Sequence, residues 1–204
     1  MIYLIIDIET SGFNKVSDEI LEVGYLRVNE DLQILGADNF YFYKPGWKVG
    51  PTDIHGLTEE FLLEHTSEFD ESLAKLYAVY RDSAIIGKNS KRFDEPFIKS
   101  FIQKHGTERM STAESKMYLD LQDWCTPHYQ DAYQKKYGVS TTKKGTLEQL
   151  VETVVGISLE DATELYKQQL PEFTERVRPH AALYDAFLTY LVLVDCKSRR
   201  GLKM

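Results

Sequence analysis

The first 43 residues alternate between apolar stretches and short polar turns, a pattern that predicts three β-strands. An apolar run begins at Tyr3 and meets its first acidic residue at Asp7. Residues 19–28 and 33–43 are rich in aromatic and β-branched side chains, which favour strands. Because only short polar segments separate the three runs, we expect an antiparallel meander.

After a loop at residues 44–51 that contains Pro and Gly, the pattern becomes helical, with two further short strands. Apolar residues recur at intervals of three and four, and capping residues or glycines mark many of the expected ends. Thr146-Leu-Glu-Gln149, for example, has the form of a capping box, and Gly156 closes the helix that it opens. We predict strands at residues 83–87 and 117–121, and helices at 59–65, 70–81, 94–105, 123–137, 146–156, 158–170 and 181–197.

The order of these elements predicts an α/β fold. Its centre is expected to be a mixed sheet of about five strands, three antiparallel and then parallel ones, flanked by helices. At 204 residues the chain is within the usual range for one domain, so residues 1–204 are expected to form a single domain.

Composition narrows the class of protein. The net charge of −8, from 32 acidic and 24 basic residues, argues against a protein that coats nucleic acid through a broad basic patch. An enzyme that holds a phosphodiester through metal ions stays compatible, because the cations then supply the positive charge. The sequence contains no apolar run of roughly 18 residues, and two cysteines are too few for a disulfide framework. Because the chain starts directly with a strand pattern, we expect no secretory signal. We expect a cytoplasmic protein that does not enter a membrane.

Two carboxylates stand at the end of the first strand, Asp7 and Glu9. Side chains alternate along a strand, so both project from the same face. Burying two unpaired acids side by side is costly, and oxygen ligands on a rigid strand suit Mg²⁺ or Mn²⁺. The alternative is an exposed strand end with two solvated charges, and further ligands downstream are needed to favour a metal.

Two later segments supply such residues. Asp94 lies where a buried strand leads into a helix, a position that also suits a capping residue. Asp185 lies among apolar residues of the last helix, where an ionisable group needs a partner or a metal. His180 precedes that helix, and on a regular helix the spacing of five residues would place it about 140° from Asp185. The two side chains can therefore converge only if His180 stands off the end of the helix.

Together these residues resemble the three motifs of the DnaQ-like 3′–5′ exonucleases, in the subgroup with three aspartates, one glutamate and one histidine (DEDDh). The motifs are Asp7-Ile-Glu9-Thr, then Phe93-Asp94, then His180 with Asp185. Ile54-His-Gly-Leu-Thr58 matches a further signature of the family, and Lys144-Gly-Thr-Leu-Glu-Gln-Leu150 resembles the helix before its third motif. Ser11-Gly-Phe-Asn14 is similar to ribonuclease T, a member that acts on RNA and DNA ends. The resemblance spans residues 1 to about 195.

The resemblance implies a ribonuclease H-like fold and a hydrolase that uses two divalent ions, Mg²⁺ or Mn²⁺. Asp7, Glu9, Asp94 and Asp185 would hold the ions. His180 would take a proton from the attacking water, which suits an imidazole because this group titrates near neutral pH. The substrate would be the 3′ end of single-stranded DNA or RNA, with DNA ahead of RNA, and the product a nucleoside 5′-monophosphate.

The resemblance also implies a binding surface for the terminal nucleotides. Phe13 would stack on a base, although it serves equally well as a core residue. Three residues separate Asn89 from Phe93 where the family usually has two, which leaves the placement of Asn89 open. The basic residues Lys88, Lys91, Arg92, Lys143 and Lys144 would follow the phosphates or simply be solvated. The expected nucleotide contacts are Thr10, Gly12, Phe13, His55, Gly56, Leu57 and Asn89.

Other functions stay open at this point. Within the enzyme class, the chain could be an exoribonuclease, a nuclease for short oligonucleotides or a relative that degrades nucleotide signals. From another class, it could be a catalytically silent nucleic-acid-binding module, although all five expected functional positions are filled. Relatives occur as monomers and as homodimers, and the sequence does not choose between these states.

Overall fold

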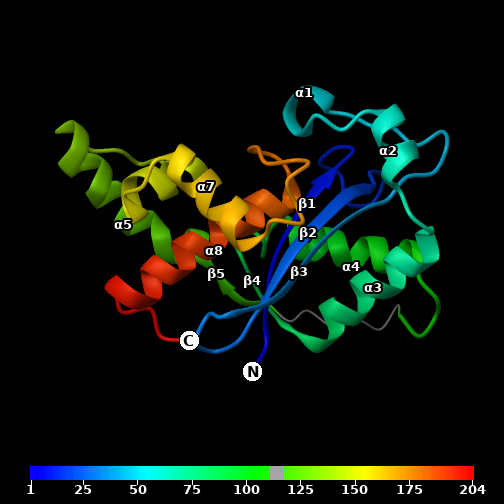
Figure 1. Ribbon diagram of the computed structural model, residues 1–204, viewed down its shortest axis with the longest axis horizontal. Coiled ribbons are helices and arrows are strands. Elements are labelled where there is room, and N and C mark those ends of the chain that lie inside the picture. The colour runs from blue at the N-terminus through cyan, green and yellow to red at the C-terminus, as the bar shows by residue number, and fades with distance from the viewer. Residues whose placement is uncertain (111–116) are drawn as a thin grey trace.

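A five-stranded mixed sheet lies at the centre of the computed structural model, which describes residues 1–110 and 117–204 (Figure 1). The strand order is β3-β2-β1-β4-β5, with antiparallel pairing among the first three strands and parallel pairing of β4 with β1 and of β5 with β4. This arrangement confirms the predicted α/β class with its mixed sheet. The strands are β1 (Tyr3–Thr10), β2 (Ile20–Val28), β3 (Ile34–Tyr41), β4 (Ala84–Gly87) and β5 (Met117–Asp120).

Helices, with β4 and β5 between them, follow the first three strands, and three of these helices begin where capping residues predicted. Thr58 caps α2, and Ser158 caps α7, each with its side-chain oxygen accepting a backbone N–H. The capping box at Thr146 is also present. The helices are α1 (Thr52–His55), α2 (Glu59–His65), α3 (Phe69–Asp82), α4 (Asp94–His105), α5 (Leu121–Tyr137), α6 (Leu147–Leu150), α7 (Leu159–Gln169) and α8 (Ala182–Arg199).

Three helical details were not predicted. The short helix α1 falls in a segment that had been expected only to lead into α2. The helix that opens at Thr146 changes after one turn into a π-helical segment, η1 (Val151–Val155), before Gly156 ends it in the left-handed conformation. Helix α5 starts directly after β5 and contains Pro127, which lacks a backbone N–H and therefore weakens the helical pattern in the sequence.

Alternate side chains of β1 face two separate cores, one on each side of the sheet. Leu4, Ile6 and Ile8 pack with α3 and α4. Tyr3 and Ile5 pack instead with α5, η1, α7 and α8. Figure 1 shows these two helical layers on opposite sides of the sheet. Residues 7 and 9 continue the second row, so the acids of β1 face the layer that contains α8.

In the part of the chain that the structure describes, none of the helices combines the length and the apolar character that a bilayer span requires.

Candidate active site

A cleft of about 520 Å³ opens at the end of the sheet where β1 and β4 terminate. Its walls come from β1, α1, the β4–α4 turn, α6 and α8. This is the edge at which the loops following parallel strands converge, and such edges commonly bind ligands. Ten of the residues expected from the sequence line it: Asp7, Glu9, Thr10, Gly12, Phe13, His55, Asn89, Asp94, His180 and Asp185.

Helix α8 reaches this cleft because β2 has a glycine where the two elements cross. Gly24 pairs with Asp7 in the sheet. A Cβ atom at Gly24 would lie 2.0 Å from the backbone nitrogen of Leu183. The missing side chain therefore allows the first turn of α8 to lie directly on the strand, which brings Asp185 over Asp7 and Glu9.

The first turn of α8 presents a buried carboxylate. Asp185 is 8% exposed, and its Oδ1 has no hydrogen-bond partner among the described residues. Burial raises the pKa of Asp185 to about 7, with a further contribution from the charge of Glu148. A buried carboxylate oxygen that has no hydrogen-bond partner and lies near other acids is suited to bind a cation.

Asp94 is the first residue of α4 and is 4% exposed. Burial raises its pKa to about 6, even though hydrogen bonds from Ser90 and from the backbone at Asp94 and Ile8 favour the charged form. The helix N-cap is Phe93, which provides no side-chain capping bond. Asp94 thus faces the cleft at the start of the helix rather than at the capping position.

The carboxyl groups repel one another, and this repulsion contributes to the raised pKa values of Asp7 and Glu9. The pKa of Asp7 lies well above its ordinary value, first because of burial and then because of Asp94, Asp185 and Glu9. Burial, together with the charges of Glu22 and Asp185, raises the pKa of Glu9 to about 9. Oxygen donors in this arrangement fit hard divalent cations such as Mg²⁺ or Mn²⁺, which would remove the repulsion.

His180 does stand off the end of the helix, as convergence with Asp185 requires. It has a left-handed backbone with φ 60°, and its backbone N–H donates to Asp185 Oδ2 at 3.2 Å. His180 is exposed to solvent and lines the cleft. Ligand atoms of Glu9, His180 and Asp185 lie within 4.8 Å of one another, so the imidazole reaches the carboxylates. In this geometry His180 is a potential ligand as well as a potential base.

The residues expected to bind nucleotides are placed in two groups around the cleft. Thr10 is buried, and its hydroxyl donates to the carbonyl of Gly12 at 2.7 Å. Phe13 is 80% exposed, so the alternative that it is a core residue is wrong. Its ring lies 6.4 Å from that of Phe93, between centroids. Asn89 lines the cleft with a left-handed backbone, φ 65°, and its N–H donates to Asp120 Oδ1 at 2.8 Å.

The second group comes from α1 and the residues after it. His55 is 1% exposed and lines the cleft, and its Nδ1 accepts the N–H of Leu57 at 3.0 Å. Burial lowers the pKa of His55, which favours a neutral imidazole. Gly56 and Leu57 do not line the cleft. Leu57 is fully buried in a cluster with Tyr43 and Leu62. It can therefore affect nucleotide binding only indirectly, by holding His55 in place through their hydrogen bond.

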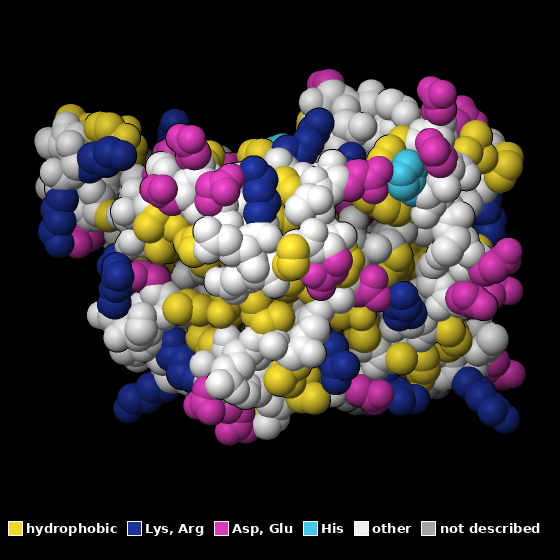
Figure 2. Space-filling view, in the orientation of Figure 1, with side chains coloured by type: hydrophobic (Ala, Val, Ile, Leu, Met, Phe, Trp, Pro, Cys, Tyr) yellow, Lys and Arg dark blue, Asp and Glu magenta, His cyan; other side chains and the backbone are white. Residues whose placement is uncertain are grey.

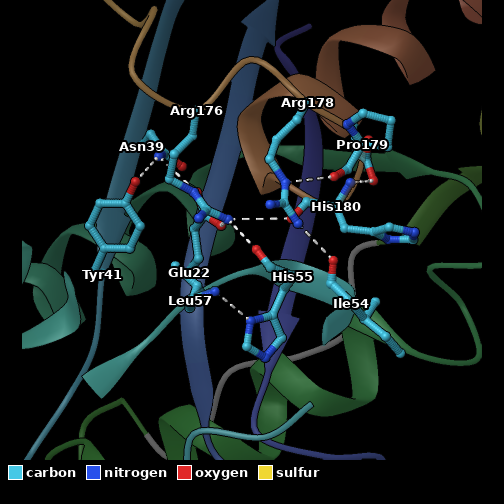
Figure 3. Close-up of polar contacts among 11 residues, drawn as sticks. Glu22, Asn39, Tyr41, Ile54, His55, Leu57, Arg176, Arg178, Pro179 and His180 are labelled. Carbon is cyan, nitrogen blue, oxygen red and sulfur yellow. Dashed lines mark hydrogen bonds and ion pairs between the residues drawn. The ribbon is translucent and has the colours of Figure 1, made fainter. Parts of the chain in front are cut away.

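Sequence patterns missed a network of charged residues behind the cleft (Figure 3). Glu22, on β2 opposite Glu9, is fully buried and forms an ion pair with Arg176 at 3.1 Å. Arg176 and Arg178 also donate to backbone carbonyls of α1. The partners lie more than 100 residues apart, so no local spacing could have indicated them. Glu148 lines the cleft as well, and so does Lys88, one of the basic residues expected to follow the phosphates.

Comparison with known proteins agrees with this geometry. A family model described as exonuclease, RNase_T, matches residues 4–193 of the chain. The DNA polymerase III PolC-type of Pediococcus pentosaceus is 26% identical over 208 residues, which cover 98% of this chain and 12% of that protein.

Solved structures of E. coli exonuclease I have the same fold. The complex with a dT13 oligonucleotide superposes with a TM-score of 0.69 at 19% identity, covering 98% of this chain and 42% of the other. The zinc ion bound form of its complex with single-stranded DNA gives a TM-score of 0.68 at 18% identity, covering 98% and 41%. The chain thus spans less than half the length of each of these similar proteins.

Proposed function

The chain belongs to the RNase_T exonuclease family, and on this basis we propose that it is a metal-dependent 3′–5′ exonuclease acting on single-stranded DNA. The observation that carries the proposal is the convergence of Asp7, Glu9, Asp94 and Asp185 in one cleft, with His180 beside them. A silent binding module has no need for four mutually repelling carboxyl groups that depress its stability.

The carboxylates suit the role of metal ligands. Asp7, Glu9 and Asp185 would hold two Mg²⁺ or Mn²⁺ ions, with Asp94 assisting. When bound, such ions neutralise the acids and stabilise negative charge on the attacking and leaving oxygens of a phosphodiester. One solved structure of the similar E. coli exonuclease I is a zinc ion bound form, which supports a divalent ion in a protein that contains this fold.

The remaining steps fall to the residues of the chain. His180 accepts a proton from water, whose oxygen attacks the phosphorus of the terminal phosphodiester. The bond between phosphorus and the 3′ oxygen of the preceding nucleotide breaks, and that oxygen takes a proton from solvent. The products are a nucleoside 5′-monophosphate and a chain shortened by one nucleotide with a free 3′-hydroxyl.

The walls of the cleft suit the end of a single strand. Phe13 is exposed where it can stack on a base, a contact that tolerates any sequence. His55 and the backbone near Gly12 border the same space. The dT13 complex of the similar exonuclease I supports single-stranded DNA as the substrate.

The strand beyond the terminal nucleotides would pass along the lobe formed by the end of α5 and the loop up to α6. Lys136, Lys143 and Lys144 are exposed on this lobe, and Lys136 Nζ lies 5.3 Å from the ring centroid of the exposed Tyr137. Figure 2 shows basic side chains on the projecting end of α5. The loop continues directly into Gly145 and Thr146, which line the cleft. Charge and continuity thus support this path for the phosphates.

The experiment that tests the proposal compares DNA and RNA strands of one sequence, labelled at the 3′ or the 5′ end. Each is incubated with Mg²⁺, with Mn²⁺ or with chelator, beside the Asp7→Ala variant. We expect metal-dependent shortening from the 3′ end, faster on DNA, and none with the variant. Shortening from the 5′ end, or cleavage that persists in chelator, would contradict the proposal. Faster loss of RNA would instead identify an exoribonuclease.

A further inference from the structure

The segment that precedes His180 is hydrogen-bonded to α1, the helix on the opposite wall of the cleft. Arg176 and Arg178, which we call the arginine clasp, come from the chain between α7 and α8. Both reach across to carbonyls of α1, as Figure 3 shows. Accepting the proposed function, we propose that Arg176 is a positioning residue that fixes His180 relative to α1, and so places the base opposite the bound nucleotide.

Arg176 makes contacts that join three parts of the site. Its Nη2 donates to the carbonyl of His55 at 2.8 Å and to the carbonyl of His180 at 3.3 Å. The same guanidinium donates to both oxygens of Glu22, from Nε at 3.3 Å and from Nη2 at 3.1 Å, so the two hydrogens of Nη2 are shared among three acceptors. One rigid, planar group thus connects α1, the base and the sheet, which a flexible ammonium could not do with the same geometry.

The anchor of the clasp in the sheet is itself held in place. Glu22 is fully buried and pairs across the strands with Glu9. Its Oε1 also accepts a hydrogen bond from Asn39 Nδ2 at 3.0 Å, and Asn39 contacts the hydroxyl of Tyr41. Because Glu22 is fixed in the sheet next to β1, its ion pair with Arg176 holds α1 and His180 at a fixed distance from that strand.

Arg178 completes the contact with α1. Its Nη2 donates to the carbonyl of Ile54 at 2.9 Å, and its Nε donates to the carbonyl of Pro179 at 3.3 Å. A Cβ atom at Gly56 would lie 2.5 Å from its Nη1, so the glycine leaves room for the guanidinium. The two cleft-lining residues Ile54 and His55 are thus both bonded, through their carbonyls, to the segment that ends at His180.

A purely structural role for this network is the competing explanation, because a buried ion pair is costly to break. Two variants separate the roles. R176K keeps a positive charge for Glu22 but lacks the planar fork that reaches both carbonyls. E22Q/R176M removes both members of the ion pair, so no buried charge is left unpaired. R199Q, at the exposed far end of α8, controls for the loss of an arginine.

We expect both clasp variants to fold but to lose at least tenfold in kcat on single-stranded DNA, with KM changed less than about threefold. Amide hydrogen exchange should become at least tenfold faster at His180 and Gly56, which flank the lost contacts, and stay unchanged in R199Q. Wild-type kcat and wild-type exchange in R176K, or in E22Q/R176M, would overturn the inference. The exchange measurement needs no substrate, so it tests the clasp even if the wild-type protein proves inactive on DNA.

Discussion

At the scale of single residues, the site gathers acids where the protein itself supplies little positive charge. Asp7, Glu9, Asp94 and Asp185 all have raised pKa values, with burial as the largest cause in each case. Among the described residues that line the cleft, Lys88 is the one lysine or arginine, and burial lowers its pKa. The folded protein therefore carries an electrostatic cost that divalent ions would relieve.

This cost predicts how stability depends on pH and metal. Folding raises the pKa of Asp185 from 3.8 to about 7 and that of Glu9 from 4.5 to about 9. The contribution of these two groups to the free energy of unfolding is therefore fully present below about pH 4. It is lost as the pH rises through their pKa values in the folded protein. We expect the Tm in chelator to fall between about pH 5 and pH 9.

Magnesium should reverse this loss. At saturating Mg²⁺ we expect a rise of roughly 5–10 °C in Tm, larger at pH 8.5 than at pH 6. Thermal unfolding of the wild type and of Asp7→Asn, followed by circular dichroism, measures both effects. The variant should show a flatter pH dependence and a smaller rise with Mg²⁺. A wild-type Tm that changes neither with pH nor with Mg²⁺ would show that the acids do not form a metal site.

His180 allows a prediction that distinguishes a base from a ligand. Removing a general base typically lowers turnover by roughly 10²–10⁴-fold. We expect His180→Ala to lower kcat by such a factor while keeping the rise of Tm with Mg²⁺, because the carboxylates stay in place. The two measurements are a nuclease time course and thermal unfolding with and without Mg²⁺. Loss of the Mg²⁺-dependent rise would instead make His180 a metal ligand, as its distance from Glu9 and Asp185 also allows.

At the scale of elements, the site depends on how closely α8 approaches β2. Gly24 lies under the backbone of Ala182 and Leu183, with no room for a methyl group. The same crossing places Asp185 over the acids of β1, since Gly24 pairs with Asp7. Strand β1 sets the positions of Asp7 and Glu9, and the contact at Gly24 sets the position of their partner.

Gly24→Ala should therefore damage both the fold and the site. We expect a loss of about 1–3 kcal/mol in the free energy of unfolding, because the backbone of α8 must move to admit the methyl group. The rise of Tm with Mg²⁺ should also shrink. Gly36→Ala, on the neighbouring strand β3, is the matched control, because a Cβ there meets nothing within 4 Å. Equal effects of the two substitutions on urea unfolding would show that the crossing is not tight.

The elements also show what the sequence could and could not predict. The alternation along β1 was enough to place Asp7 and Glu9 on one face, and the capping signals located α2, α6 and α7. Local spacing could not reveal the ion pair of Glu22 with Arg176, because its members are brought together only by tertiary packing. The exposure of Phe13 was equally out of reach, since an aromatic residue after a strand suits a core as well as a surface.

At the scale of the whole molecule, charge is distributed unevenly. The chain carries a net charge of −8, yet residues 132–147 contain four lysines and no acidic residue. Lys135 is paired with Asp131, whereas Lys143 and Lys144 are exposed and directly precede Gly145, which lines the cleft. A basic lobe on an acidic protein would attract the backbone of a nucleic acid to one place and repel it elsewhere.

This distribution predicts the salt dependence of binding. Replacing Lys143 and Lys144 by Gln should weaken binding of a single-stranded 20-mer in chelator and lower the slope of log K against log salt by about 1–2. The double variant K75Q/K203Q loses the same charge away from the lobe and should leave the slope unchanged. Fluorescence anisotropy between low and moderate salt measures both. Identical slopes for the two double variants would place the path of the strand elsewhere.

The measurement that tests the central claim most directly is the chemical identity of the product formed in ¹⁸O-labelled water. Single-stranded DNA is digested with Mg²⁺, and the released nucleotides are analysed by mass spectrometry beside the Asp7→Ala protein. Water attack at the terminal phosphorus predicts nucleoside 5′-monophosphates that carry one ¹⁸O each, appearing in sequence order from the 3′ end. Release of 3′-monophosphates or of internal fragments, or an equal yield from Asp7→Ala, would contradict hydrolysis by this carboxylate site.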